Sequence, residues 1–180
     1  MMHIRPAEAA DLQACAMLDG SYQTEQIWQM ERRLEEPELA AAFHLVTLPR
    51  RITVAYPPFE LAHLVERWER QGGLGLWVAE WENQFLGFVD VTPLPEQRLG
   101  WINHLIVKRR YRRHGVGSGL LYQAMAWARE QGLERMLVVL QSKNHPAIQF
   151  CRRFGYQYGG YNEFYYGNQD IALFFGLDLR

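Results

Sequence analysis

The chain has few cysteines and no long apolar run. Its two cysteines, Cys15 and Cys151, cannot build a disulfide framework, so two reduced thiols are the simplest interpretation, with one bond between them as the alternative. No apolar stretch reaches the roughly 18 residues of a membrane helix, and the first residues lack the apolar segment of a secretory signal. These absences predict a cytoplasmic protein that does not bind membranes.

An excess of charge of one sign is also missing. Nineteen Lys and Arg face 20 Asp and Glu, and the net charge of −1 argues against a chain that coats nucleic acid. The balance is uneven, however, because residues 108–114 hold five Lys or Arg and no acidic residue. The rest of the chain is therefore acidic on balance.

The chain does have the length and apolar content of a folded domain. Its 180 residues, of which 48% are hydrophobic and 22% charged, predict a single domain over residues 1–180. Nine Phe, nine Tyr and six Trp are present, and many of these rings gather between Phe154 and Phe175. This density of aromatic residues is unusual and indicates a role in packing or in a binding site.

Hydrophobic periodicity predicts a mixed order of elements. Helices are expected over residues 7–18, 25–36, 59–71, 117–131 and 144–154, the second of them ended by Pro37. Strands are expected over residues 3–5, 43–48, 51–55, 75–81, 85–92, 99–107, 136–141, 163–166 and 170–179. Antiparallel strands followed by strand–helix–strand–helix predict an α/β or α+β fold, in which helices flank a mixed, mostly antiparallel sheet.

The segment most informative about chemistry covers residues 105–121. An apolar strand ends at Val107, a basic loop follows, and Gly115, Gly117 and Gly119 open a helix. Glycine lets backbone N–H groups approach a ligand closely, and a helix start leaves such donors unpaired at the positive end of its dipole. Together with the basic side chains, this pattern predicts a pyrophosphate site.

Four other kinds of loop share some of these features. A P-loop needs Gly-Lys-Ser/Thr, which is absent, and a dinucleotide fingerprint would follow its strand directly, whereas seven residues separate Val107 from Gly115. A basic surface loop whose small residues serve helix packing stays open. So does a nucleic-acid patch, although the acidic remainder of the chain disfavours it.

Two segments together resemble motifs of the GNAT superfamily of N-acetyltransferases. Residues 112–117, Arg-Arg-His-Gly-Val-Gly, resemble the motif Gln/Arg-x-x-Gly-x-Gly/Ala, and residues 144–156 resemble the downstream Asn-x-x-Ala-x-x-Phe-Tyr-x-x-x-Gly-Phe motif. A narrower similarity, to streptothricin acetyltransferases, which acetylate an amine of a cationic antibiotic, covers residues 22–30, 140–144, 154–161 and 170–174. Val139 departs from it, because those enzymes carry an acidic residue there.

The resemblance implies a GNAT-like fold over nearly the whole chain and acetyl-CoA as co-substrate. Main-chain N–H groups of residues 113–118 would hold the pyrophosphate, and strand residues 105–107 would pair with the pantetheine arm. Val107 N–H would polarise the acetyl carbonyl. Asn144 would bond pantetheine or only cap a helix. The implied cofactor-binding residues are Leu105, Ile106, Val107, Arg112, Arg113, His114, Gly115, Val116, Gly117, Ser118, Asn144, Ala147 and Phe150, the last two also serving as core.

The implied reaction is direct attack of an amine on the thioester in a ternary complex. Trp101 stands where the family often has a Glu base, and Cys151 where it often has a Tyr acid, so neither role carries over. His104 is the preferred base because of its ordinary pKa. The alternatives are Asp90, Glu163 or a chain of waters.

Tyr161 is the preferred acid, because it follows two glycines at which the backbone can turn into a cleft. The alternative for it and the other tail tyrosines is packing between strands. By the resemblance, residues 21–28 would form one wall of the acceptor site.

The sequence thus predicts an N-acetyltransferase that acts on a primary amine of a small molecule, which the acidic balance suggests to be cationic. Two alternatives stay open: transfer to a protein N-terminus or lysine, and an acetyl-CoA-binding module with little catalysis. We expect a monomer or homodimer without a nucleic-acid, membrane or metal partner.

Overall fold

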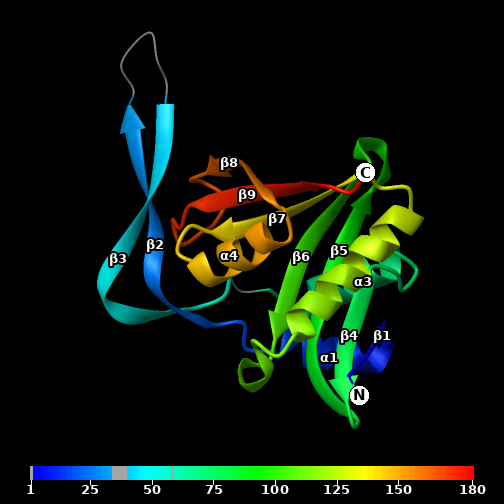
Figure 1. Cartoon of the computed structure of the whole chain (residues 1–180). Helices are drawn as coiled ribbons and strands as arrows, with labels where there is room; N and C mark the ends of the chain where they lie inside the picture. The colour runs from blue at the N-terminus through cyan, green and yellow to red at the C-terminus, as the bar shows by residue number, and fades with distance from the viewer. Residues whose placement is uncertain (1, 34–39, 58) are drawn as a thin grey trace. The chain divides into compact units, whose positions relative to one another are not determined.

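The computed structural model describes residues 2–33, 40–57 and 59–180 (Figure 1). The chain divides into two compact units that alternate along the sequence. The first comprises residues 1–20, 56–138 and 176–180, and the second comprises residues 21–55 and 139–175. The expectation of a single domain over residues 1–180 stays a prediction.

The first unit is built on a sheet with the strand order β1-β4-β5-β6-β7, in which neighbours are antiparallel except for the parallel β6–β7 pair. Strand β7 ends in the second unit, and β9 begins there. The elements are β1 (His3–Pro6), η1 (Ala9–Asp11), α1 (Leu12–Ala16), α2 (Leu61–Arg70), β4 (Leu76–Trp81), β5 (Gln84–Leu94), η2 (Pro95–Gln97), β6 (Leu99–Val107), η3 (Arg109–Tyr111), α3 (Val116–Glu130), β7 (Arg135–Gln141) and β9 (Ala172–Asp178).

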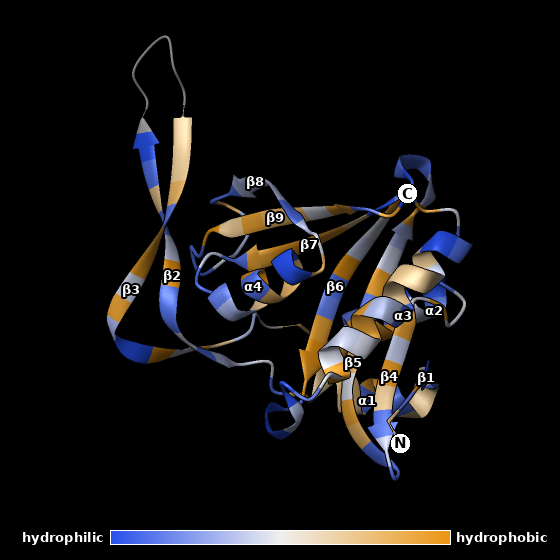
Figure 2. Ribbon diagram, in the orientation of Figure 1, coloured by the Kyte–Doolittle hydropathy of each residue, from blue (hydrophilic) through white to orange (hydrophobic). Residues whose placement is uncertain are grey.

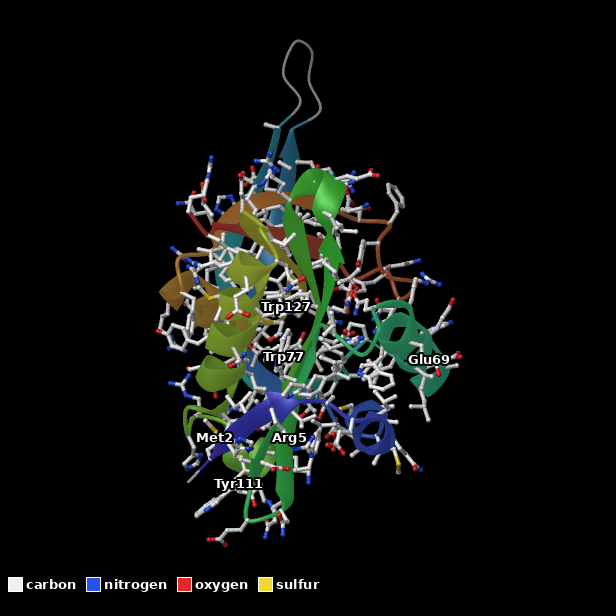
Figure 3. All side chains as sticks on the ribbon, turned by 90° about the vertical axis from the view of Figure 1, so that its right-hand side faces the viewer. Met2, Arg5, Glu69, Trp77, Tyr111 and Trp127 are labelled. Carbon is white, nitrogen blue, oxygen red and sulfur yellow. The ribbon has the colours of Figure 1, made fainter. Side chains whose placement is uncertain are left out.

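Strands β4, β5 and β6 contain many apolar residues, orange in Figure 2, and such residues pack on both faces of this sheet. On one face, Trp77 of β4 meets Trp127 of α3 edge to face, with ring centroids 5.0 Å apart (Figure 3). On the other face, Phe88 and Ile106 pack in one core with Leu64 of α2 and Cys15 of α1. Because side chains alternate along a strand, the same strands supply both cores.

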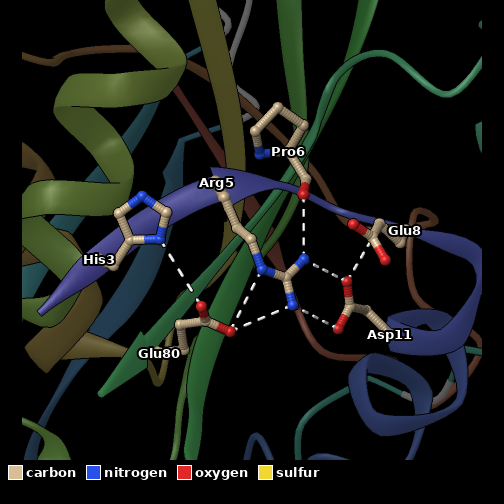
Figure 4. A network of polar contacts seen from close by, with 6 residues as sticks. All are labelled: His3, Arg5, Pro6, Glu8, Asp11 and Glu80. Carbon is tan, nitrogen blue, oxygen red and sulfur yellow. Dashed lines mark hydrogen bonds and ion pairs between the residues drawn. The ribbon is translucent and has the colours of Figure 1, made fainter. Parts of the chain in front are cut away.

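A polar network fastens the N-terminal strand (Figure 4). The Arg5 guanidinium donates to both carboxylate oxygens of Asp11, at 2.7 and 3.1 Å, and it pairs with Glu80 of β4 at 3.1 Å. Asp11 also accepts the Glu8 N–H at 2.8 Å. Burial acts to raise the pKa of Asp11, but these hydrogen bonds outweigh it and lower that pKa. The charged pair therefore holds β1 and η1 in place at neutral pH.

The second unit contains a two-stranded antiparallel ribbon, β2-β3, and one helix. It also contains neighbouring strands in the order β7-β9-β8. Its further elements are β2 (Tyr22–Arg33), β3 (Ala40–Val54), α4 (His145–Arg153) and β8 (Gln157–Asn162). The fold class that the sequence predicts, a mixed and mostly antiparallel sheet flanked by helices, is confirmed.

The helix predicted over residues 25–36 is wrong, because the chain from Tyr22 to Arg33 is strand β2; residues 34–36 and Pro37 lie outside the described residues. Glu, Gln and Arg favour helices in isolation. Here Thr24 is buried between exposed Gln23 and Glu25, a period of two that pairing with β3 enforces.

The two strands predicted around Pro49 are one strand, β3. The register shifts between Thr24 and Gln26, and residues 48–51 lie in the resulting irregularity of the ladder. Proline has no N–H to donate, and an irregular stretch of a two-stranded ribbon tolerates that loss.

The strand predicted over residues 163–166 is also wrong. The chain there is bent, and the strand is β8, which spans Gln157–Asn162 and includes Gly159 and Gly160. Gly160 has a φ of 146°, a conformation that side chains disfavour, so β8 passes through a position suited to glycine. Asn162 ends the strand by accepting the Phe164 N–H at 2.8 Å.

Candidate functional site

Strand β6 has a partly open edge. It pairs with β5 from Leu99 to Val107, but among the described residues its pairing with β7 stops at Ile102. The register against β5 shifts next to Asp90 and leaves Asn103 as the extra residue of a bulge. From Asn103 to Val107, the β7 side of β6 is therefore available to an extended ligand that adds as a strand.

A glycine in β5, Gly87, lets β5 approach this end of β6 closely. A Cβ at Gly87 of β5 would lie 2.4 Å from the Ile106 carbonyl oxygen and 2.9 Å from the Val107 Cα. Both are backbone atoms, which cannot move aside as a side chain would. A larger residue would thus displace the segment from Leu105 to Val107, which sequence analysis assigned to the cofactor.

The start of α3 offers a set of backbone donors. The first helical hydrogen bond joins the Gly119 N–H to the Gly115 carbonyl at 2.9 Å, so the N–H groups of Val116, Gly117 and Ser118 precede it. Gly115 has a φ of 84°, and no atom lies within 4 Å of where its Cβ would be. That space, the free donors and the helix dipole fit a pyrophosphate.

The side chain of Arg112 donates hydrogen bonds to backbone carbonyls of the protein. Its Nε donates to the Val107 carbonyl at 2.8 Å and its Nη2 to the Asp19 carbonyl at 3.2 Å. The Arg112 carbonyl in turn contacts His114 Nδ1 at 2.8 Å. Arg112 therefore ties the loop to the end of β6, whereas Arg113 is exposed. The assignment of Arg112, Arg113 and His114 to cofactor contacts stays a prediction.

His104, the preferred base, lies among aromatic rings. Its ring stacks on Phe59 with centroids 4.0 Å apart, and its Nδ1 is 3.0 Å from the Tyr56 hydroxyl. Burial, and then the charge of Arg67, lower the pKa of His104 to about 3. The imidazole is therefore neutral at physiological pH and weakly basic, which disfavours it as a proton acceptor from an amine.

The alternative carboxylate bases are both in ion pairs. Asp90, opposite His104 on β5 and 2% exposed, accepts from Arg67 Nη2 at 2.7 Å and Nε at 3.2 Å. Burial raises the pKa of Asp90, while Arg67 and Asn103 act against that rise. Glu163 of the second unit pairs with Arg32. Sequence reasoning missed Arg67 and Tyr56, since only folding brings them to β5 and β6.

In the second unit, Asn144 caps α4, and its Oδ1 accepts the Ala147 N–H at 3.2 Å. The cap uses the amide oxygen and leaves the amide NH₂ for the predicted contact with pantetheine. The ring centroid of half-buried Phe150 lies 4.9 Å from the ring centroid of Phe154. Burial raises the pKa of the Cys151 thiol to about 12, which fits a core residue.

Tyr161, the preferred acid, lies on β8 with 38% of its surface exposed. Its ring packs edge to face on Phe43 of β3, with centroids 5.4 Å apart. Tyr158 packs on the same ring at 5.9 Å. These contacts favour the strand-packing alternative for the two tyrosines, and the acid role of Tyr161 stays a prediction.

Neither a membrane-spanning helix nor a metal-binding cluster is present among the described residues. Within the described ranges, no helix is long and apolar enough to cross a membrane. Among those same residues, no group of three or more His, Cys, Asp or Glu side chains is placed to hold a metal ion. Cys15 and Cys151 are both free, so the single disulfide weighed as an alternative is not formed.

A mixed sheet with a partly open strand edge, followed by a glycine-opened helix start, defines an α/β protein suited to an elongated, phosphate-bearing ligand. Residues 28–156 match the acetyltransferase (GNAT) family, and the chain belongs to that family. The resemblance drawn from the two motifs is thereby confirmed.

Known proteins are similar to this chain at two levels. Streptothricin acetyltransferase A of Bacillus subtilis (strain 168) is 30% identical over 102 residues, 52% of this chain and 56% of that protein. A nourseothricin acetyltransferase structure has a TM-score of 0.84 at 22% identity and 99% coverage of both chains. A second structure, from Bacillus anthracis str. Ames, is described as a candidate streptothricin acetyltransferase in complex with acetyl coenzyme A. It has a TM-score of 0.77 at 20% identity and 99% coverage of both chains.

The two structural similarities show the fold. The chain spans about half the length of the curated relatives it matches.

Proposed function

We propose that this chain is an N-acetyltransferase that moves the acetyl group of acetyl-CoA to a primary amine of a small molecule. The observation that carries the proposal is the open edge of β6 from Asn103 to Val107, followed by the N–H donors of residues 116–118. The strand edge suits the amides of pantetheine, and the helix start suits the pyrophosphate. Family membership and the streptothricin acetyltransferase relatives support the acetyl donor and the small amine.

The chain's part in the reaction is positioning and charge stabilisation. The amine nitrogen attacks the thioester carbonyl, and a backbone N–H of the open edge of β6, which begins at Asn103, stabilises the oxyanion. The carbon–sulfur bond then breaks and the thiolate leaves, with little need of an acid because a thiol has a pKa of about 8.5. The amine loses its proton to water, since His104 is a weak base and Asp90 is paired with Arg67.

Acetyl-CoA is expected to stabilise the folded protein. At a concentration of 100 times Kd, the free energy of unfolding should rise by about 2.7 kcal/mol, which a thermal melt detects. Thiol release should then be measured with small amines, polyamines, cationic antibiotics and N-terminal peptides. Stabilisation with turnover of small amines supports the proposal. Turnover of peptides alone would replace it by protein acetylation, and stabilisation without any turnover by a binding module.

The pH profile tests how the proton leaves. With a saturating acetyl donor, kcat/KM should rise with pH in step with the unprotonated fraction of an alkyl amine, whose pKa is about 10.4. No inflection is expected at about 6.5, the ordinary pKa of histidine, because the pKa of His104 is lowered to about 3. His104→Gln should keep this profile. An inflection near neutral pH that His104→Gln removes would instead make His104 the base.

A further inference from the structure

An open groove of about 420 Å³ lies in the first unit, where β6 and β7 begin and β9 ends. Most of its lining is apolar. Leu99, Leu137 and Leu177 line it and are only partly buried, and Gln97, Arg135 and Asp178 line it as well. Three half-exposed leucines on three strands offer a surface on which an apolar group would lose contact with water.

The groove shares a sheet face with the middle of β6. Trp101 pairs with Leu137 of β7 on one side and with Thr92 of β5 on the other, and paired residues point to the same face. Leu99 has the same orientation as Trp101, two residues away on the strand. The bulge keeps Asn103 on this face as well, because its amide donates to the Thr92 hydroxyl at 2.8 Å.

One face of β6 therefore carries a row of three side chains, here called the path, that leads from the groove toward the open edge. It starts at Leu99, passes the half-buried ring of Trp101 and arrives at Asn103, where pairing with β7 has ended. Four residues of extended strand cover about 13 Å. A molecule lying along this path would place its two ends in chemically different surroundings.

We propose that the groove binds the apolar body of the acceptor, whose amine reaches the open edge of β6 along Trp101. The inference rests on the proposed function and adds a substrate class to it: elongated primary amines that carry an apolar or aromatic group about 13 Å from the reacting nitrogen. Trp101, at the position where the family often has a Glu base, then serves to bind the acceptor rather than to take its proton.

A series of phenylalkylamines, lengthened one methylene at a time, tests this assignment. With the wild-type protein, kcat/KM should pass through a maximum at the spacer that spans the path. Gly176→Leu should fill the groove without backbone strain, because a Cβ there would meet only the Met136 carbonyl oxygen, at 3.9 Å. This variant should lower kcat/KM for the best amine by about 10- to 100-fold and leave short amines and acetyl-CoA affinity unchanged.

Gly167→Leu is the matched control, since a Cβ there would have no atom within 4 Å and Gly167 does not line the groove. It should keep the wild-type length profile. Binding of the phenylalkylamines to the CoA complex, measured by calorimetry, gives a readout without turnover. Binding that Gly176→Leu weakens, with no acetylation of any amine, would support the groove and overturn the proposed function. Equal length profiles in wild type and Gly176→Leu, with turnover intact, would overturn the groove alone.

Discussion

Gly117→Glu is expected to fold and to bind acetyl-CoA at least about a hundredfold more weakly than the wild-type protein, a difference of about 2.8 kcal/mol. Gly117 is the second residue of α3 and precedes the first helical hydrogen bond, so its N–H is one of the donors proposed to bind the pyrophosphate. A carboxylate there would repel the pyrophosphate and occupy its space. The same carboxylate is favourable at a helix N-terminus, so the fold should survive.

Tyr122→Glu is the matched control, because it introduces the same charge on the same helix at a position that is 61% exposed. It should bind acetyl-CoA as the wild type does. Equilibrium titration by calorimetry measures both affinities, and a thermal melt without ligand checks that both variants are folded. Wild-type affinity in Gly117→Glu would place the pyrophosphate away from the start of α3.

The glycine-rich loop and the start of α3 could be predicted from the sequence because their signals are local. The glycines of residues 115–119 directly follow a basic loop and an apolar strand, and the structure puts the helix start at Val116, one residue from the expected position. The Asn144 cap is equally local, since it bonds a residue three positions further on. Such contacts depend on neighbouring residues whatever the rest of the chain does.

The bulge at Asn103 and the surroundings of His104 could not be predicted in the same way. The bulge exists only because β6 pairs with β5, and the low pKa of His104 depends on burial and on Arg67, distant in sequence. The sequence therefore indicated which histidine lies on the central strand but not how its ring is surrounded. The ribbon strand β2 was missed for the same reason, because its period of two is meaningful only opposite β3.

Arg67→Met is expected to cost about 3–5 kcal/mol of unfolding free energy at neutral pH. The arginine is the cation that faces Asp90, whose side chain is 2% exposed, and its loss would leave a buried carboxylate without its ion pair. Arg70→Met on the same helix is the matched control. Arg70 pairs with Glu66 at the surface, where both side chains are more than half exposed, so its loss should cost less than about 1 kcal/mol.

The pH dependence separates a lost charge pair from lost packing. Burial already raises the pKa of Asp90 in the wild type, and removing Arg67 should raise it further. A carboxylate with a raised pKa in the folded state favours folding at pH values below its unfolded pKa of about 3.9 and loses that contribution as pH rises through the folded pKa. The cost of Arg67→Met in urea unfolding should therefore shrink from pH 7.5 to pH 5, and Asp90→Asn added to Arg67→Met should restore much of the stability. A cost that stays the same at both pH values would mean that Arg67 acts by packing its stem on β5.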